Sequence, residues 1–180
     1  MIRIIQWTLA SIFTLFILTA CVNVAPGGQG YTIAIPMQTI NSTVGSNFPQ
    51  NQKTSYGTLT INKPNILGQQ GGNKLGLGTS FSFANMFIPN GIKGAVSLSS
   101  GVRYNASDRG LYLANPMIDN IEVHNFALSK YLTPEIKNMI GQLIAKEVTR
   151  RPIYHINNMG ASLVKGIGVE NGNVVVTLGL

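Results

Sequence analysis

The feature of this chain that most constrains its fold is a regular alternation of residue types between positions 75 and 84. Leucine, threonine or phenylalanine occupies every second position, and the positions between them hold glycine, serine or alanine. Because side chains alternate between the two faces of a β-strand, a repeat of two residues puts all the large side chains on one face, which lies in a core. We therefore predict a long strand whose core face is formed by Leu75, Leu77, Thr79, Phe81 and Phe83.

Further β-prone segments follow this strand and predict an antiparallel meander. Asn90-Gly91 is a strong hairpin signal, because both residue types tolerate a positive φ angle. The segment 92–104 then has apolar residues on one face, and Asp108-Arg109-Gly110 forms a second turn. The next segment, 111–123, contains Pro116, which predicts a bend or bulge within that strand.

Shorter β-prone segments lie toward the two ends of the folded region. Residues 31–35 and 53–67 precede the long strand, and a last hairpin turns at Asn171-Gly172 before the apolar segment 174–178. Two short helices are also expected, one opened by Pro36 and one over residues 157–164.

The clearest helix is predicted over residues 133–151. Thr133 suits the N-cap, Pro134 suits the first turn, and Pro152 ends the helix. Apolar residues recur at spacings of three and four, which is typical of an amphipathic helix. The residues on this face are Ile136, Met139, Ile140, Leu143, Ile144 and Val148.

These elements together predict an α+β fold. Consecutive long strands joined by short turns form a sheet that twists and curls. We expect a strongly curved antiparallel sheet, in meander order, wrapped round the long C-terminal amphipathic helix. Residues 31–180 would form this single domain, since about 150 residues can build a core without disulfide bonds.

The N-terminus indicates export. Arg3 precedes an uncharged apolar run that ends near Leu18, which is short for a membrane-spanning helix but typical of a signal peptide. Leu18, Thr19 and Ala20 then precede Cys21, the single cysteine of the chain. This motif looks like the bacterial lipobox, in which the cysteine becomes the acylated first residue of a lipoprotein. We expect residues 1–20 to be the signal peptide and Cys21 to be acylated.

A short tether and an outer-membrane location are expected after the acylated cysteine. Residues 21–30 contain Pro26, Gly27 and Gly28 and no charge, as is typical of a flexible linker. By analogy with other lipoproteins, Val22 favours export to the outer membrane, where the domain would face the periplasm. The permanent anchor helix with an incidental cysteine is the alternative.

Composition argues against nucleic-acid binding. The formal net charge is +7, but the lysines and arginines are scattered along the chain and form no basic stripe. The ordinary interpretation of this charge is solubility, and the alternative is attraction to an anionic membrane surface.

No residue pattern indicates an enzyme, a metal site or a cofactor. His124 and His155 are interpreted as surface or packing residues, and no HExxH motif or cysteine cluster is present. Asp119 and Glu122 lie three residues apart in a predicted strand, so their side chains point to opposite faces. We therefore expect a non-catalytic protein without a cofactor.

Several short stretches resemble the YceB-like family of bacterial lipoproteins. They are Gly110-Leu111-Tyr112-Leu113, Ile121-Glu122-Val123, Thr133-Pro134-Glu135-Ile136, Arg151-Pro152-Ile153-Tyr154 and Lys165-Gly166-Ile167-Gly168-Val169. The resemblance implies a fold similar to tubular lipid-binding domains, with a curved sheet, a long helix and an apolar groove between them. The glycine- and asparagine-rich middle of this chain departs from the pattern.

Two functions remain open at this point. The first is binding of a lipid, a fatty acid or another apolar ligand in a groove between sheet and helix, lined by Leu77, Phe81, Phe83, Val96, Leu98, Ile140 and Ile144. The second is a non-catalytic structural or interaction lipoprotein that holds a protein partner of unknown identity at the outer membrane. A core in which these apolar faces simply fill one another is the ordinary alternative to a groove.

Overall fold

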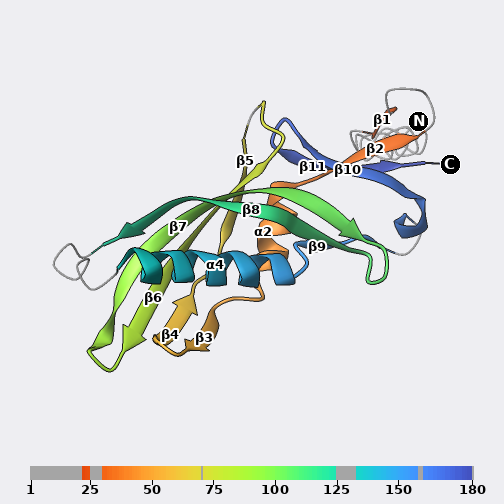
Figure 1. Ribbon diagram of the computed structural model, residues 1–180. Helices are drawn as coiled ribbons and strands as arrows, with labels where there is room; N and C mark the ends of the chain where they lie inside the picture. Colours follow the sequence, from red (N-terminus) through yellow and green to blue (C-terminus); the bar gives the residue numbers. More distant parts are fainter. Residues whose placement is uncertain (1–21, 25–29, 70, 125–132, 158–159, 180) are drawn as a thin grey trace, which may run out of the picture.

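In the part of the chain that the structure describes, the fold consists of two antiparallel sheets and two α-helices (Figure 1). The computed structural model describes residues 22–24, 30–69, 71–124, 133–157 and 160–179. Neighbouring strands pair antiparallel throughout the described residues.

The larger sheet has seven strands, in the order β3-β4-β6-β7-β8-β9, with β5 paired to β6 beside β4. Its longest strands are the central ones, so the alternating segment that dominates the sequence lies in the middle of the sheet. The strands are β3 (Gln50–Thr54), β4 (Gly57–Ile61), β5 (Asn65–Gly68), β6 (Leu75–Asn85), β7 (Ile88–Asn105), β8 (Gly110–Val123) and β9 (Tyr154–His155).

The smaller sheet joins the two ends of the described chain. Its order is β1-β2-β11-β10, so the last strand of the protein pairs with one of the first. A 3-10 turn, η2 (Ala161–Leu163), leads into it. The strands are β1 (Val22–Val24), β2 (Tyr31–Ile35), β10 (Val164–Glu170) and β11 (Asn173–Leu178).

The expected fold class was wrong. The protein is mostly β, its strands form two separate sheets, and neither sheet is curled round a helix. The helix α4 (Pro134–Arg150) has 17 residues and is followed by three more strands, so it is not a long C-terminal helix. The error arose because the last hairpin pairs with β2 rather than extending the meander.

The helix α4 lies against β8 along the larger sheet (Figure 1). Its start is set by Thr133, whose side-chain oxygen accepts a hydrogen bond from the Ile136 N–H, as the sequence predicted. Gly141 is buried in the middle of the helix, and a Cβ there would lie 2.5 Å from the Ile118 Cδ1 atom of β8. The absence of a side chain at this position lets the helix approach the sheet closely.

The second helix, α2 (Met37–Gly45), follows Pro36 and buries Ile40 and Val44. Asn41 fixes this helix to β5, because its side chain donates to the Ile66 carbonyl at 2.8 Å and accepts from the Ile66 N–H at 2.7 Å. The expected helix over 157–164 is reduced to the 3-10 turn within its described part.

The turn between β6 and β7 does not fall at Asn90-Gly91. That pair lies within β7, where Gly91 has a φ of 73°, and the chain turns earlier, between Asn85 and Ile88. The Asn85 side chain stabilises the earlier turn, since its Oδ1 atom accepts hydrogen bonds from the Phe87 and Ile88 N–H groups. The bend predicted at Pro116 is confirmed by shifts of register between β7 and β8 beside Met117.

Candidate functional site

The seven residues predicted to line a groove all lie together in the core. They come from β6, β7 and α4, and none is more than 3% exposed. Cross-strand pairing produces this cluster, since Leu77 lies opposite Leu98 and Thr79 lies opposite Val96. The structure therefore brings Leu77, Phe81, Phe83, Val96, Leu98, Ile140 and Ile144 together as buried packing residues.

A hollow of about 220 Å³ lies beside the first turns of α4. Ile136 and Met139 form its apolar wall on the helix, and Tyr56, from the turn between β3 and β4, faces them. Thr133 and Glu135 provide polar atoms at the same hollow. The position of this wall follows from the Thr133 cap, because the cap fixes where the first helical turn begins.

A second hollow, of about 430 Å³, adjoins the same tyrosine at the end of the larger sheet. It lies between the β3–β4 turn and the β6–β7 turn and is lined by Thr54, Ser55, Tyr56, Gly57, Asn85, Met86 and Phe87. Gly57 allows the two turns to lie close together, since a Cβ there would be 2.3 Å from the Ala84 carbonyl oxygen. Tyr56 therefore borders both hollows.

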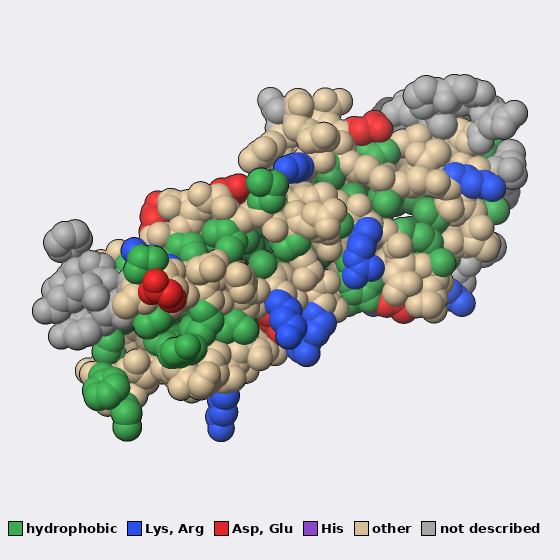
Figure 2. All heavy atoms as spheres, in the orientation of Figure 1, with side chains coloured by type: hydrophobic (Ala, Val, Ile, Leu, Met, Phe, Trp, Pro, Cys, Tyr) green, Lys and Arg blue, Asp and Glu red, His purple; other side chains and the backbone are tan. Residues whose placement is uncertain are grey.

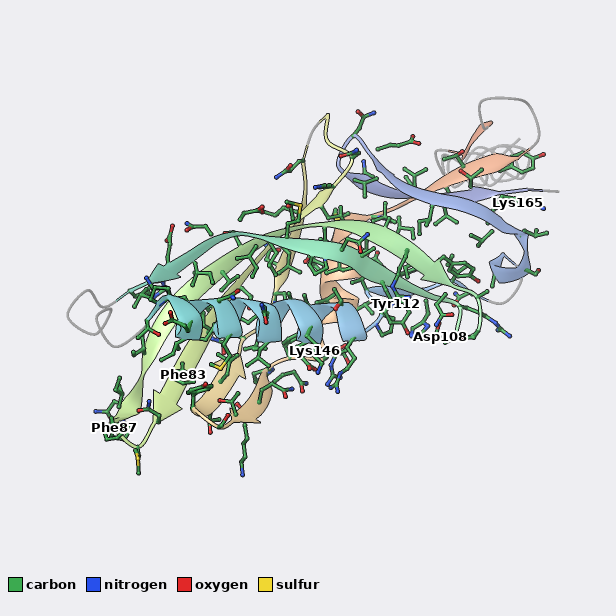
Figure 3. All side chains as sticks on the ribbon, viewed as in Figure 1. Phe83, Phe87, Asp108, Tyr112, Lys146 and Lys165 are labelled. Carbon is green, nitrogen blue, oxygen red and sulfur yellow. The ribbon has the colours of Figure 1, made fainter. Side chains whose placement is uncertain are left out.

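Large apolar side chains are exposed at this end of the molecule. Met86 is 84% exposed, Phe87 is 83% exposed and Tyr56 is 60% exposed. Figure 2 shows hydrophobic side chains gathered over the end that carries the β6–β7 turn. Figure 3 shows the contrast between Phe83, which lies near α4, and Phe87, which lies at the far tip. We call Tyr56, Met86 and Phe87 the apolar tip.

Among the residues that the structure describes, few charges lie at the site. Lys53 is exposed on β3, close to the β3–β4 turn that carries Tyr56. Glu135 is the acidic residue that lines the smaller hollow, and a hydrogen bond from the Thr133 side chain lowers the pKa of its carboxyl. The larger hollow has no charged residue among the seven that line it. The site is therefore suited to contact with apolar groups.

A polar cluster at the β7–β8 turn has a structural role. The Tyr112 hydroxyl donates to the Asp108 carboxylate, which lowers the pKa of Asp108 and raises the pKa of Tyr112. The Asp108 carboxylate also accepts from the Gly110 N–H at 3.0 Å, and the Arg103 guanidinium lies 4.6 Å from the centre of the Tyr112 ring. His155 contacts the backbone of Asp108. These contacts hold the turn in place.

A buried carboxylate fixes the end of α4. Glu147 is 4% exposed, and its side chain accepts hydrogen bonds from Arg150 at 3.0 Å, Arg151 at 3.1 Å and Gln52 at 3.1 Å. The bond from Gln52 connects α4 to β3. Because every oxygen of this carboxylate has a partner, its role is to join the helix to the sheet.

The predicted signal and lipidation residues, Leu18, Thr19, Ala20 and Cys21, lie outside the described residues. In the expected tether, residues 22–24 form β1 and Gly30 is buried. No helix in the described part of the chain is long and apolar enough to cross a membrane. In the same described ranges, no three histidine, cysteine or acidic side chains are grouped closely enough to hold a metal ion.

The apolar tip is the part of the site that the sequence interpretation missed. The signal was present, because Met86 and Phe87 are adjacent large apolar residues between the strand residue Asn85 and the breaker Pro89. Two such side chains beside a turn-forming asparagine favour an exposed apolar turn. The interpretation placed the turn at Asn90-Gly91 and so assigned this segment no function.

Comparison with known families finds a match to the family described as a protein of unknown function, DUF1439. The match covers residues 37–172, which include α2, α4 and the whole of the larger sheet. The chain belongs to the DUF1439 family. No curated protein matches it. The residues that line both hollows and form the apolar tip lie within the matched range.

Proposed function

We propose that this DUF1439 protein is a lipoprotein anchored in the outer membrane, and that its periplasmic domain binds lipid or another apolar ligand. The observation that carries the proposal is the apolar hollow between Tyr56 and the first turns of α4. The resemblance of short sequence stretches to YceB-like lipoproteins supports the same function. Binding of this kind needs an apolar surface and no reactive group.

The ligand site in this proposal lies at the end of the core rather than along its middle. The residues first expected to line a groove are packed against one another, whereas Ile136 and Met139 are partly exposed to the hollow. An acyl chain would contact these two side chains and the Tyr56 ring. The polar end of the ligand would face Thr133 and the helix N-terminus, which offers hydrogen-bond donors.

Filling the smaller hollow should reduce ligand binding. Residues 22–180 contain the whole described core, which extends from Ile35 to Leu178, so this fragment is suitable for the assay. We expect Met139→Trp to weaken uptake of a fluorescent fatty acid by about tenfold or more, because the larger ring occupies the apolar volume that the ligand needs. Asn138→Trp is the matched control, since residue 138 is exposed on the same helix.

Native mass spectrometry of the same fragment identifies any lipid that copurifies with it. The proposal requires about one bound lipid per chain in the parent fragment and a reduced fraction in Met139→Trp. Fragment that is free of lipid and takes up no fatty acid would contradict the lipid-binding function.

Cys21→Ser should abolish the anchor. We expect the variant to accumulate as uncleaved precursor in a bacterial host, because the serine hydroxyl does not replace the thiol that is acylated. Each buried acyl CH₂ contributes about 0.8 kcal/mol, so the loss of the acyl chains removes stable attachment to the outer membrane. Thr19→Ala keeps a small residue in the motif and should mature normally. Metabolic labelling with palmitate and membrane fractionation test both variants, and a mature, outer-membrane serine variant would rule out the anchor.

A second candidate function is a structural or interaction lipoprotein that holds a protein partner at the outer membrane. The observation that favours it is the combination of a buried core with the exposed apolar tip, since exposed apolar patches commonly mark docking sites. The absence of lipid in native mass spectrometry, together with a partner crosslinked through the tip, would establish this alternative.

A further inference from the structure

We propose that the apolar tip is a membrane-contact element that inserts Met86 and Phe87 into the surface of a phospholipid bilayer. The inference deepens the proposed lipid-binding function and rests on it, because the tip borders the hollow in which the ligand would lie. The bilayer would then be the surface from which the domain takes up its ligand, or to which the domain delivers that ligand.

The shape of the tip favours a bilayer over a flat protein surface. The two most exposed large apolar side chains of the described structure are adjacent at the end of a strand pair, at 84% and 83% exposure. The β6–β7 turn that carries them projects from the molecule (Figure 3). The side chain of Asn85 bonds the N–H groups of Phe87 and Ile88, which fixes the turn that presents them. A small, projecting, ordered apolar turn can enter the region between lipid head groups.

The residues around the tip also suit a membrane interface. Tyr56 combines an aromatic ring with a hydroxyl, and such side chains are enriched at the level of the lipid head groups. Lys53 is exposed on the neighbouring strand, where its charge is attracted to anionic head groups. The hollow between the two turns has no acidic residue among its lining residues. Lys53 therefore favours an anionic bilayer at the two turns, whereas Glu135 lies at the smaller hollow on the α4 side of Tyr56.

The position of the tip in the fold adds a further argument. The strand β1, which directly follows the expected acylation site, lies at the opposite end of the molecule from the β6–β7 turn (Figure 1). If the anchor is joined to β1, the tip therefore lies at the end of the domain that is far from the anchoring point. The smaller hollow is lined by Tyr56 of the tip and by Ile136 and Met139 of α4, so a lipid taken up at the tip would find these two apolar side chains beside Tyr56.

A single tryptophan at the tip tests the inference directly. The fragment 22–180 contains no tryptophan, because the only one in the chain is Trp7. Phe87→Trp should show a blue shift of emission and quenching by brominated lipid when vesicles of phosphatidylethanolamine and phosphatidylglycerol are added. Leu67→Trp is the control: Leu67 is 58% exposed on β5, away from the tip, and its tryptophan should remain in water.

Loss of the apolar side chains should then remove vesicle binding. We expect Phe87→Ala to weaken binding of the fragment to these vesicles by about tenfold or more, as burial of one phenylalanine side chain requires. Lys53→Glu should weaken binding further on anionic vesicles, and its effect should fall as salt is raised. Both positions are exposed, so these variants should fold like the parent.

The outcomes separate this inference from the proposed function. If Phe87→Trp stays water-exposed with vesicles while the fragment still binds fatty acid, the membrane-contact inference is wrong and the lipid-binding function stands. If the tryptophan inserts but no fatty acid is taken up, the tip is a membrane contact and the proposed ligand site is wrong. Equal insertion of Leu67→Trp, or crosslinking of the tip to a protein in place of vesicle binding, would overturn the inference.

Discussion

Replacing Ile144 with alanine should lower the free energy of unfolding by about 2–5 kcal/mol. Ile144 lies on the buried face of α4, is 0% exposed and belongs to the core that α4 shares with the larger sheet. Removing three carbon atoms from such a side chain loses apolar burial and leaves a cavity that neighbouring residues fill only partly. Leu143, one residue earlier, is only partly buried, so its truncation should cost less.

Urea denaturation of the fragment 22–180 measures this change. Gln142→Ala, on the exposed face of the same helix, is the control. Because alanine is a good helix former, the free energy of unfolding of this variant should lie within about 0.5 kcal/mol of the parent value. If Ile144→Ala unfolds at the same urea concentration as Gln142→Ala, α4 does not pack on the sheet as described.

Adding a side chain at Gly94 should also destabilise the fold strongly. Gly94 is buried in β7, opposite Phe81 on one side and Val123 on the other. A Cβ there would lie 2.3 Å from the Glu122 carbonyl oxygen and 2.5 Å from the Phe81 Cζ atom. Because a backbone carbonyl cannot move aside as a flexible side chain can, Gly94→Val forces the strands apart. Overpacking of this kind costs about 1–3 kcal/mol or more.

Gly78→Val is the matched control for this prediction. Gly78 lies in β6 of the same sheet, and a Cβ there would meet no atom within 4 Å. Valine is favoured in strands, so this variant should be as stable as the parent or slightly more stable. Urea denaturation curves of Gly94→Val and Gly78→Val test this prediction. Equal free energies of unfolding for the two variants would show that β7 and β8 are not paired at Gly94 as described.

Local structure could be predicted well where the sequence pattern is strong. The alternation from Leu75 to Phe83 corresponds to β6, and each residue of that face is buried. The cap residue Thr133 and the helix that follows it were also predictable. These features depend on backbone geometry and on hydrophobic periodicity, both of which act between residues close together in the chain.

The location of the candidate site needed the structure. Phe87 continues the odd-numbered series of Phe81 and Phe83, so periodicity alone would place it on the core face. The chain turns after Asn85, because the side chain of that residue bonds the next N–H groups, and Phe87 is therefore exposed. The groove residues were rightly grouped by face, but only packing shows that they contact one another in the core.

The sequence by itself determined the strand β6, the apolar face of α4 and the residue at which α4 begins. Tertiary structure alone decided that β2 pairs with β11, which divides the strands into two sheets, and that the turns carrying Tyr56 and Phe87 lie side by side. The physical reason is that periodicity specifies a buried face without specifying its partner. Strand partners from opposite ends of the chain are selected by the packing of the whole core. No single segment of the sequence contains enough information to specify that packing.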